Sequence, residues 1–332
     1  MPDLKKILFI RFSSIGDIVL TTPLIRCLKN QLPDVEIHFL TKKKFASVLV
    51  ANPHVDNLHT IEDKIGEVIP QLKSENFDHV IDLHKNLRSL GIRIRLRKPT
   101  TSFSKINFSK WLMVKFKINK LPQQHIVDRY FKALDKFSIR NDGKGLDYFI
   151  NENDKLSLLN LPEFYRKGFV GIVIGGMHIT KILPVEKVIE LVNKIDKPIV
   201  LLGGPEDFKR GEEIANAKAG SVLNTCGKFP LNQSASLVSL AEKIMTNDTG
   251  LMHVAAAFKK EIISVWGNTI PEFGMYPYLP QMEALDKSHV FEVKNLNCRP
   301  CSKIGFKKCP QTHFKCMNNQ DVDGMARIIN FN

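Results

Sequence analysis

The chain has 332 residues, of which 43% are hydrophobic and 25% are charged. These values are typical of globular proteins, and the length suits two domains that each bury a core of their own. The chain has no run of about 18 apolar residues, and the apolar stretch near its N-terminus is too short for a signal peptide. We therefore expect a cytoplasmic or peripheral protein that does not span a membrane.

Positive charge is concentrated in the first half of the chain. The formal net charge is +14, and residues 1–150 hold 26 Lys and Arg against 15 Asp and Glu. Between Lys85 and Lys120 there are 11 basic residues and no acid. Within this stretch, residues 107–117 mix aromatics with lysines, as interfacial segments on anionic lipid do. A solvated basic face is the simpler alternative. Nucleic acid is not expected, because five Tyr and two Trp offer little for base stacking and no recognition motif appears.

The first half alternates strands and helices, as apolar runs of strand type are followed by helical patterns. The predicted strands are 4–12, 35–41, 57–61 and 79–83. The predicted helices are 18–31, 45–51, 65–74 and 123–137. A polar, charged passage over 141–167 then predicts a linker, with Pro162 and Gly168 marking the boundary.

A second alternating series begins after this linker. Its predicted strands are 169–174, 199–202, 222–224, 244–246 and 262–266, with helices between them. Two such series predict an α/β protein with two doubly wound parallel sheets. We place the N-terminal domain at residues 1–155 and the C-terminal domain at 168–332.

Ligands of doubly wound sheets bind outside the carboxyl ends of the strands, so the loops that follow strands are the candidate sites. These loops are 13–17, 175–181, 203–207, 247–253 and 267–269. Neither G-x-G-x-x-G nor the P-loop sequence occurs in them, which disfavours a dehydrogenase or a P-loop NTPase.

Residues 247–253 form the most informative of these loops. Asp248 and Thr249 are good N-cap residues for a predicted helix over 251–258, and free backbone N–H groups at such a helix start attract anions. Gly250 would let a ligand approach the backbone, and His253 would lie one turn into the helix. The pattern favours a diphosphate site. An ordinary capped helix with a packed histidine is the alternative.

Three other loops offer side chains for chemistry. Thr180 and Lys181 could hold a phosphate by a hydroxyl and a point charge, although a solvated surface lysine is the simpler interpretation. A carboxylate of the loop 203–207 could accept hydrogen bonds from ribose hydroxyls, or Asp207 could cap a helix. Asp17 suits a general base if it stays ionised near pH 7, or an N-cap with a purely structural role.

Four segments together resemble glycosyltransferase family 9, the lipopolysaccharide heptosyltransferases. They occur in the family's order and span nearly the whole chain: 11–23, 82–89, 203–205 and 247–253. The resemblance implies a GT-B architecture, in which two Rossmann-like domains face a cleft. It also implies that the acceptor binds the N-terminal domain and that the donor, ADP-heptose, binds the C-terminal domain. The basic N-terminal half fits an acidic acceptor independently.

The resemblance assigns roles to the candidate residues. Asp17 matches the family's proposed base, while Lys181 and Thr180 match its phosphate-contacting lysine and the neighbouring hydroxyl. Asp17 and Lys181 are thus the predicted catalytic residues. No metal or other cofactor is required, because lysine and helix N-termini take the place of a cation. The other donor-binding positions are Glu206 or Asp207 for the ribose, and Asp248, Thr249, Gly250 and His253 for the diphosphate. The acceptor-binding positions are Ser14, Gly16, His84, Lys85 and Arg88.

The expected function is transfer of heptose, with inversion, to a lipopolysaccharide inner-core acceptor at the inner face of the cytoplasmic membrane. Two departures from the family pattern keep other donors and acceptors open: residues 177–180 are looser than the family's Thr- or Ser-rich version, and Ile182 and Leu183 replace a polar-aromatic pair. A non-catalytic anion- or lipid-binding protein and a sugar-nucleotide epimerase of the same architecture are the rivals from other classes.

Four of the six cysteines cluster near the C-terminus. Four thiols could bind zinc tetrahedrally, but their spacing is not the repeated C-x2-C of zinc knuckles. Reduced, packed thiols are the favoured interpretation, and a structural zinc site is the alternative. The four residues are Cys298, Cys301, Cys309 and Cys316.

Overall fold

The computed structural model describes residues 4–331, which form two compact units. Unit 1 comprises the chain up to Lys105 together with Gln124–Phe149, and unit 2 comprises Ile106–Gln123 together with the chain from Ile150 onward. Residues 106–123 thus group with the second unit, although the sequence places them in the N-terminal domain. The assignment of acceptor and donor roles to the two domains stays a prediction.

Unit 1 is built on a parallel sheet of five strands in the order β3-β2-β1-β4-β5. The central strand β1 is almost wholly buried because helices cover both faces of such a sheet. The strands are β1 (Lys6–Ile10), β2 (Glu36–Lys42), β3 (Asn57–Ile61), β4 (His79–Asp82) and β5 (Thr100–Ser102). The helices are α1 (Ile15–Val19), α2 (Thr22–Gln31), α3 (Ile69–Ser74), α4 (Leu87–Leu96) and α6 (Ile126–Phe131), with 3-10 turns η1 (Lys43–Val48), η2 (Ile65–Glu67) and η3 (Lys132–Phe137).

Four predicted strands of unit 1 are confirmed, but its helices differ from the prediction. The helix expected over 18–31 is two helices, because the chain turns at Thr21 and restarts with Pro23 in the first turn of α2. The helix expected over 123–137 is α-helical only as far as Phe131 and continues as a 3-10 turn. Two elements of the basic segment, α4 and β5, were not predicted from the sequence.

Unit 2 is built on a parallel sheet of six strands in the order β11-β10-β9-β6-β7-β8. Its strands are β6 (Val170–Val173), β7 (Ile199–Leu202), β8 (Val222–Asn224), β9 (Lys243–Asn247), β10 (Glu261–Trp266) and β11 (Ser288–Glu292), of which β11 was not predicted. Its helices are α5 (Asn107–Phe116), α7 (Val185–Asn193), α8 (Phe208–Ala217), α9 (Leu231–Leu240), α10 (Gly250–Ala257), α11 (Gln281–Lys287), α12 (Lys315–Asn318) and α13 (Val322–Asn330). Its 3-10 turns are η4 (Glu152–Asp154), η5 (Leu158–Asn160), η6 (Glu163–Tyr165), η7 (Ile179–Lys181), η8 (Pro205–Asp207) and η9 (Pro271–Phe273).

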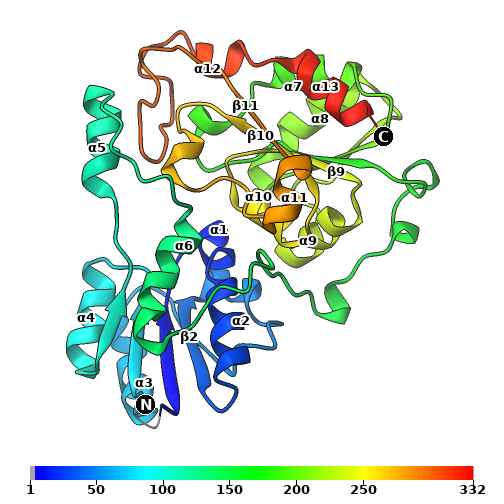
Figure 1. The fold of residues 1–332 in the computed structure, drawn as a ribbon. Coiled ribbons are helices and arrows are strands. Elements are labelled where there is room, and N and C mark those ends of the chain that lie inside the picture. Colours follow the sequence, from blue (N-terminus) through cyan, green and yellow to red (C-terminus); the bar gives the residue numbers. More distant parts are fainter. Residues whose placement is uncertain (1–3, 332) are drawn as a thin grey trace. The chain divides into compact units, whose positions relative to one another are not determined.

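Each sheet has one switch point, where neighbouring strands lead their connections to opposite sides. In unit 1 the switch lies between β1 and β4, and in unit 2 it lies between β6 and β9. The loops that leave the carboxyl ends of these strand pairs are therefore neighbours, and such points bind ligands in doubly wound proteins. Figure 1 labels β9 together with its other neighbour in the sheet, β10. None of the helices within residues 4–331 has the length and apolar character that a membrane span requires.

Candidate functional sites at the two switch points

The loop after β1 holds Asp17 on the first turn of α1. Ser14 is the N-cap with an extended backbone, and Asp17 is the third helical residue, so the N-cap position predicted for Asp17 belongs to Ser14. One oxygen of Asp17, Oδ2, accepts hydrogen bonds from the Ser14 amide at 3.1 Å and from its hydroxyl at 2.9 Å. Gly16 is buried in the same helical turn. The carboxylate is thereby fixed in position, with Oδ1 left for another partner.

That partner is Arg11, whose Nη2 lies 2.7 Å from Oδ1 of Asp17. Arg11 is buried at the end of β1, where it also donates to the carbonyls of Ser13 at 2.8 Å and of Leu83 at 2.6 Å. Burial would raise the pKa of Asp17, but the charge of Arg11 and the bonds from Ser14 outweigh it and hold the pKa below its usual range. Asp17 is therefore ionised at neutral pH.

Arg11 is a residue of this site whose role was not predicted from the sequence. The available signal was a cation placed directly after an apolar strand, where burial forces it to find an anionic partner.

The loop after β4 brings His84 to the same switch point. Asp82 is fully buried, and its Oδ1 accepts from the amides of His84 at 3.0 Å and of Lys85 at 2.7 Å. The His84 ring meets Phe12 edge-on, with centroids 4.8 Å apart. Burial and the nearby positive charge of Arg11 lower the pKa of His84 to about 4, so the ring is neutral near pH 7. His84 can thus offer a hydrogen bond beside Asp17 without adding charge.

The two cations of this loop are placed differently. Lys85 has a left-handed backbone, and its ammonium group donates to the carbonyl of Phe103 at 2.9 Å. Lys105, which the sequence analysis did not single out, donates to the Lys85 carbonyl at 2.8 Å. Arg88 is exposed on the first turn of α4. Of the predicted acceptor contacts in the β4 loop, His84 therefore lies near Asp17, while Lys85 and Arg88 extend a basic rim.

In unit 2 the loops after β6 and β9 join through Lys181 and Asp248. The lysine Nζ lies 2.5 Å from Oδ2 of Asp248, and the two side chains are 17% and 10% exposed. Thr269, in the loop after β10, donates its hydroxyl to the same oxygen at 2.9 Å. The loop was predicted to be a candidate site, but Thr269 was not singled out within it. This arrangement holds an ammonium group at the switch point of the second sheet.

The start of α10 lies next to this pair. Thr249 is its N-cap and Gly250 its first residue, which confirms the predicted strand-to-helix junction with the helix beginning one residue earlier than expected. His253 is 2% exposed on the same helix. Thr180 is also buried, and its hydroxyl accepts from the Phe306 amide at 2.8 Å and donates to the Phe306 carbonyl at 3.2 Å. Thr180 therefore anchors the loop that carries Lys181.

Asp207 and Glu206 have different surroundings. Asp207 is fully buried, accepts from the Gly204 amide at 2.9 Å and pairs with Arg210. A Cβ atom at Gly175 would overlap the Asp207 carboxylate, so only glycine fits this close approach. Asp207 thus ties the loops after β6 and β7 together. Glu206 is exposed and is the better placed of the two to meet a ligand.

The four C-terminal cysteines are neighbours, since Cys298, Cys301 and Cys309 all lie near enough to Cys316 to act on its pKa. Among residues 4–331 their sulfur atoms do not converge within 4.8 Å as a metal-ligand group would. All six are free thiols, and Cys316 packs in the core of unit 2. Burial raises the pKa of Cys316 to about 12 and also raises that of Cys301, so both remain protonated. Cys298 lies 3.8 Å from Nε2 of His313.

Within residues 4–331, the group of His, Cys, Asp or Glu whose ligand atoms converge within 4.8 Å is His38, His59 and Glu75. Several of its hydrogen-bonding groups are already engaged, although the buried Nδ1 of His59 has no hydrogen-bond partner within the described residues. His38 Nδ1 lies 2.8 Å from His59 Nε2, and Lys6 donates to Glu75 at 3.2 Å. Burial lowers the pKa of both histidines. This cluster is an internal hydrogen-bond network closed by a lysine.

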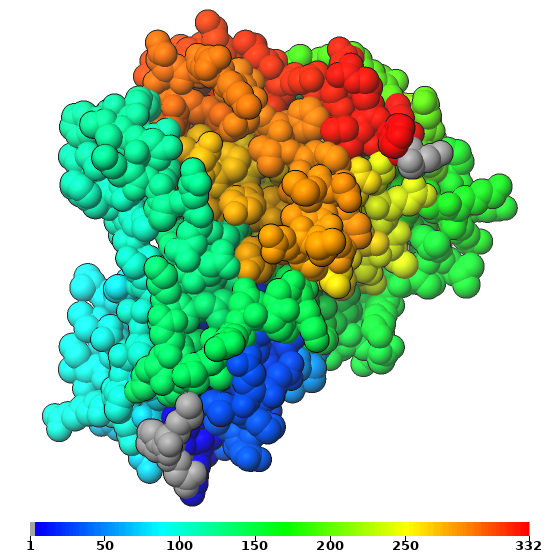
Figure 2. Space-filling model, viewed as in Figure 1, coloured from blue at the N-terminus to red at the C-terminus, as the bar shows by residue number. Residues whose placement is uncertain are grey.

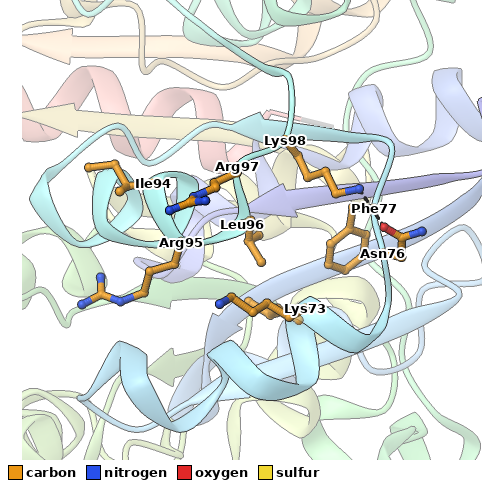
Figure 3. Close-up of a pocket in the computed structure, with 9 residues that line it drawn as sticks. Lys73, Asn76, Phe77, Ile94, Arg95, Leu96, Arg97 and Lys98 are labelled. Atoms are coloured by element: carbon orange, nitrogen blue, oxygen red, sulfur yellow. Dashed lines mark hydrogen bonds between the residues drawn. The ribbon is translucent and has the colours of Figure 1, made fainter.

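A pocket of about 510 Å³ opens between α3 and α4, where cationic side chains surround an apolar floor (Figure 3). It borders the residues that precede β4 and β5, and so lies at the amino ends of the strands, opposite to the switch point. Neither Asp17 nor His84 lines it. The cations are Lys73, Arg95, Arg97 and Lys98, and the floor includes Leu72, Phe77 and Leu96.

The fold matches known two-domain glycosyltransferases. The structure of a glycosyltransferase family 9 protein from Veillonella parvula aligns with a TM-score of 0.70 and 24% identity, over 87% of each chain. Escherichia coli heptosyltransferase WaaC, solved with ADP, aligns with a TM-score of 0.69 and 19% identity, over 98% of each chain. The two Rossmann-like units therefore define the chain as a protein of the GT-B class.

Sequence comparison identifies the family. The profile of glycosyltransferase family 9 (heptosyltransferase) matches residues 65–308. The chain is 26% identical to lipopolysaccharide heptosyltransferase 1 of Campylobacter coli, over 80% of this chain and 84% of that protein. It is 24% identical to lipopolysaccharide heptosyltransferase 3 of Escherichia coli, over 82% and 89% respectively. The chain belongs to glycosyltransferase family 9, the heptosyltransferases, and is an enzyme of heptose transfer.

Proposed function

We propose that this enzyme transfers heptose, with inversion, from ADP-heptose to an inner-core acceptor of lipopolysaccharide. The observation that carries the proposal is that each unit holds an ion pair at its switch point, one with a partly exposed carboxylate and the other with a partly exposed ammonium group. A glycosyl transfer needs these two groups, a base for the acceptor and a cation for the leaving diphosphate. The names of the heptosyltransferase relatives support the same substrates.

In the proposed step, Asp17 acts as the general base. The acceptor hydroxyl attacks the anomeric carbon, and its proton passes to the Asp17 carboxylate. The bond from the anomeric carbon to the diphosphate oxygen breaks, and its electron pair leaves with ADP. Arg11 keeps Asp17 ionised and oriented, while Ser14, Gly16 and His84 shape the acceptor side, with Lys85 and Arg88 for acidic groups of the core.

On the donor side, Lys181 takes up the charge that develops on the departing diphosphate. The proposal gives the backbone of Thr249 and Gly250, at the N-terminus of α10, the same task, so that no metal ion or other cofactor is required. Asp248 holds Lys181 in place, Thr180 and Asp207 fix the loops around it, and His253 belongs with Thr249 and Gly250 to the diphosphate side of α10. Glu206 takes the ribose.

Localisation follows from the acceptor. A lipid-borne acceptor places the enzyme at the inner face of the cytoplasmic membrane as a peripheral protein, and the excess of Lys and Arg in residues 1–150 supports contact with an anionic surface. Residues 177–180, Ile182 and Leu183 depart from the family pattern on the donor side. Transfer from another ADP-sugar is the second candidate.

The decisive experiment measures ADP release from ADP-heptose with and without a Kdo-bearing lipid A acceptor. We expect acceptor-dependent release by the wild type and its loss in Asp17→Asn. Release that does not depend on acceptor would instead indicate action on the donor alone. A folded, ADP-binding protein without release would reject ADP-heptose or this acceptor, and a screen of ADP-sugars would follow.

A further inference from the structure

Helix α5 carries large apolar side chains that the fold does not bury. None of its ten residues is buried, and Phe108, Trp111 and Phe116 are 69%, 45% and 54% exposed. The three rings form one cluster, with centroid distances of 5.9 Å between Phe108 and Trp111 and 5.2 Å between Trp111 and Phe116. An exposed aromatic cluster of this kind marks an interaction surface, because folding gains nothing from it.

Other contacts hold α5 to the rest of unit 2. The ammonium group of Lys117 donates to the carbonyls of Pro300 at 2.7 Å and of Cys298 at 3.3 Å. The ammonium group of Lys110 lies 5.1 Å from the centroid of the Phe273 ring. In Figures 1 and 2 the helix, in teal, lies beside the orange segment and its atoms are uncovered on this face. The helix is thus tethered while its aromatic cluster stays open to solvent.

The charges around the cluster narrow the choice of partner. Residues 105–120 contain five lysines and no acid, and they end the longer acid-free stretch that starts at Lys85. A second copy of this chain would bring another +14 charges to the contact, which opposes self-association. An anionic lipid bilayer offers what the helix lacks, a negative surface above an apolar layer. Aromatic side chains, and Trp above all, prefer the interface between the two.

We propose that α5 is the element by which this enzyme docks on an anionic phospholipid bilayer. Phe108, Trp111 and Phe116 enter the interface, while Lys115 and Lys120 meet the headgroups. The inference deepens the peripheral membrane contact of the proposed function, and it relies on that function only for the reason the enzyme visits the membrane. A bound helix would keep the enzyme at the surface that carries its acceptor.

Tryptophan fluorescence tests this directly, because the chain has two tryptophans in opposite settings. Trp111 is 45% exposed, whereas Trp266 is 1% exposed and donates to Ser264 at 3.0 Å. Vesicles of equal parts phosphatidylethanolamine and phosphatidylglycerol should shift the emission to shorter wavelength, and vesicles of phosphatidylcholine should not. The Trp111→Phe variant should still sediment with the anionic vesicles but lose the shift.

Two double variants distinguish insertion of the α5 aromatic side chains into the bilayer from nonspecific adhesion of exposed apolar side chains. Phe108→Ser with Phe116→Ser should weaken binding to the anionic vesicles by about tenfold. The matched control, Leu159→Ser with Phe164→Ser, removes two other exposed apolar side chains of unit 2, which are 75% and 54% exposed, and should bind as the wild type does. Equal binding by all three proteins, or equal weakening by both double variants, would overturn the proposal.

The charges need a control of their own. Lys115→Gln with Lys120→Gln should weaken binding and reduce its dependence on salt more than Lys43→Gln with Lys44→Gln, which removes the same charge from an exposed part of unit 1. Binding that appears only when lipid A is added to the vesicles would assign α5 to the acceptor's acyl chains and reject a bilayer surface.

Activity on an acceptor without acyl chains distinguishes this proposal from the proposed function. The Phe108→Ser, Phe116→Ser variant should transfer to such an acceptor at the wild-type rate and lose rate only on acceptor embedded in vesicles. Vesicle binding by a wild type that transfers no heptose would reject the proposed function and keep the α5 surface. Heptose transfer by a wild type that binds no vesicles would reject the α5 surface and keep the proposed function.

Discussion

The two switch points hold ion pairs with exchanged roles. In unit 1 the cation is the inner partner, since Arg11 is 11% exposed and Asp17 is 24% exposed. In unit 2 the acid is the inner partner, since Asp248 is 10% exposed and Lys181 is 17% exposed. The group that a ligand can reach is therefore a carboxylate in one unit and an ammonium in the other.

The same fold, used twice in this chain, thus presents groups of opposite charge at its two switch points. In both pairs the inner partner is held by further hydrogen bonds, from Arg11 to two backbone carbonyls and from Thr269 to Asp248. In unit 1 the charge of Arg11 keeps Asp17 ionised. In both units the inner partner fixes the position of the outer group, and such preorganisation lowers the cost of reaching a transition state. Substituting one partner of a pair at a time tests whether the outer group takes part in the reaction and whether the inner group only holds it in position.

The largest effect should come from Asp17→Asn. The amide keeps the shape of the side chain but cannot take a proton, so we expect the transfer rate to fall by about 10³-fold. Binding of ADP, which the proposal places on unit 2, should stay within about twofold, as isothermal titration would show. Asp34→Asn, at an exposed position of the same unit, is the matched control and should transfer normally. Turnover by the Asn variant would remove Asp17 from the mechanism.

Lys181→Ala should cause the second largest loss of activity. Loss of the ammonium removes a group that stabilises the leaving diphosphate, so kcat/KM for the donor should fall by about 10²-fold, with kcat and KM both affected. Lys181→Arg should recover part of the loss because it keeps the charge. Lys167→Ala, at an exposed site of unit 2, should leave both constants unchanged. An effect on acceptor KM alone would contradict the assignment of Lys181 to the donor.

Arg11→Gln should move the pH profile as well as the rate. In the folded protein the pKa of Asp17 is lowered, so the active carboxylate persists well into acid, and its contribution to stability is lost only as the pH falls through that lowered value. Without Arg11, burial dominates and the pKa of Asp17 rises. The acid limb of kcat/KM should then lie at higher pH, and Arg11→Lys should show a smaller displacement. An unmoved acid limb would mean that Asp17 does not govern it.

Much of the fold could be predicted because the buried strands of a parallel sheet are recognisable in the sequence as short apolar runs. The apolar run at 199–202 became a strand with those bounds, since a strand buried on both faces needs continuous hydrophobic residues. The segment 57–61 also kept its bounds, but as an edge strand in which the exposed Thr60 stands between the buried His59 and Ile61. The helices were harder to predict from the sequence. α4 was missed because Arg88, Arg93 and Arg95 made the segment look like a charged surface rather than an element that buries Ile92 and Leu96.

The positions of the candidate residues could be predicted where they lie in loops that follow strands, but their bonding partners from other loops could not. Asp17, Lys181 and Asp248 stand next to predicted strands, so their positions followed from topology. Thr269 could not be linked to Asp248, because the contact joins residues 21 positions apart through the order of β9 and β10. Likewise nothing in the sequence shows that Thr180 bonds to the backbone of Phe306.

Thr269→Val should have the smallest effect, and it is the sharpest test of positioning in unit 2. The substitution removes one hydrogen bond to Asp248, worth about 1 kcal/mol, so the donor KM should rise by about fivefold with little change in kcat. Because Thr269 acts through Asp248 on Lys181, it should add almost nothing in a Lys181→Ala background. A full, additive effect in that background would show that Thr269 meets the donor itself, and the inner partner of unit 2 would then be part of the binding surface rather than its support.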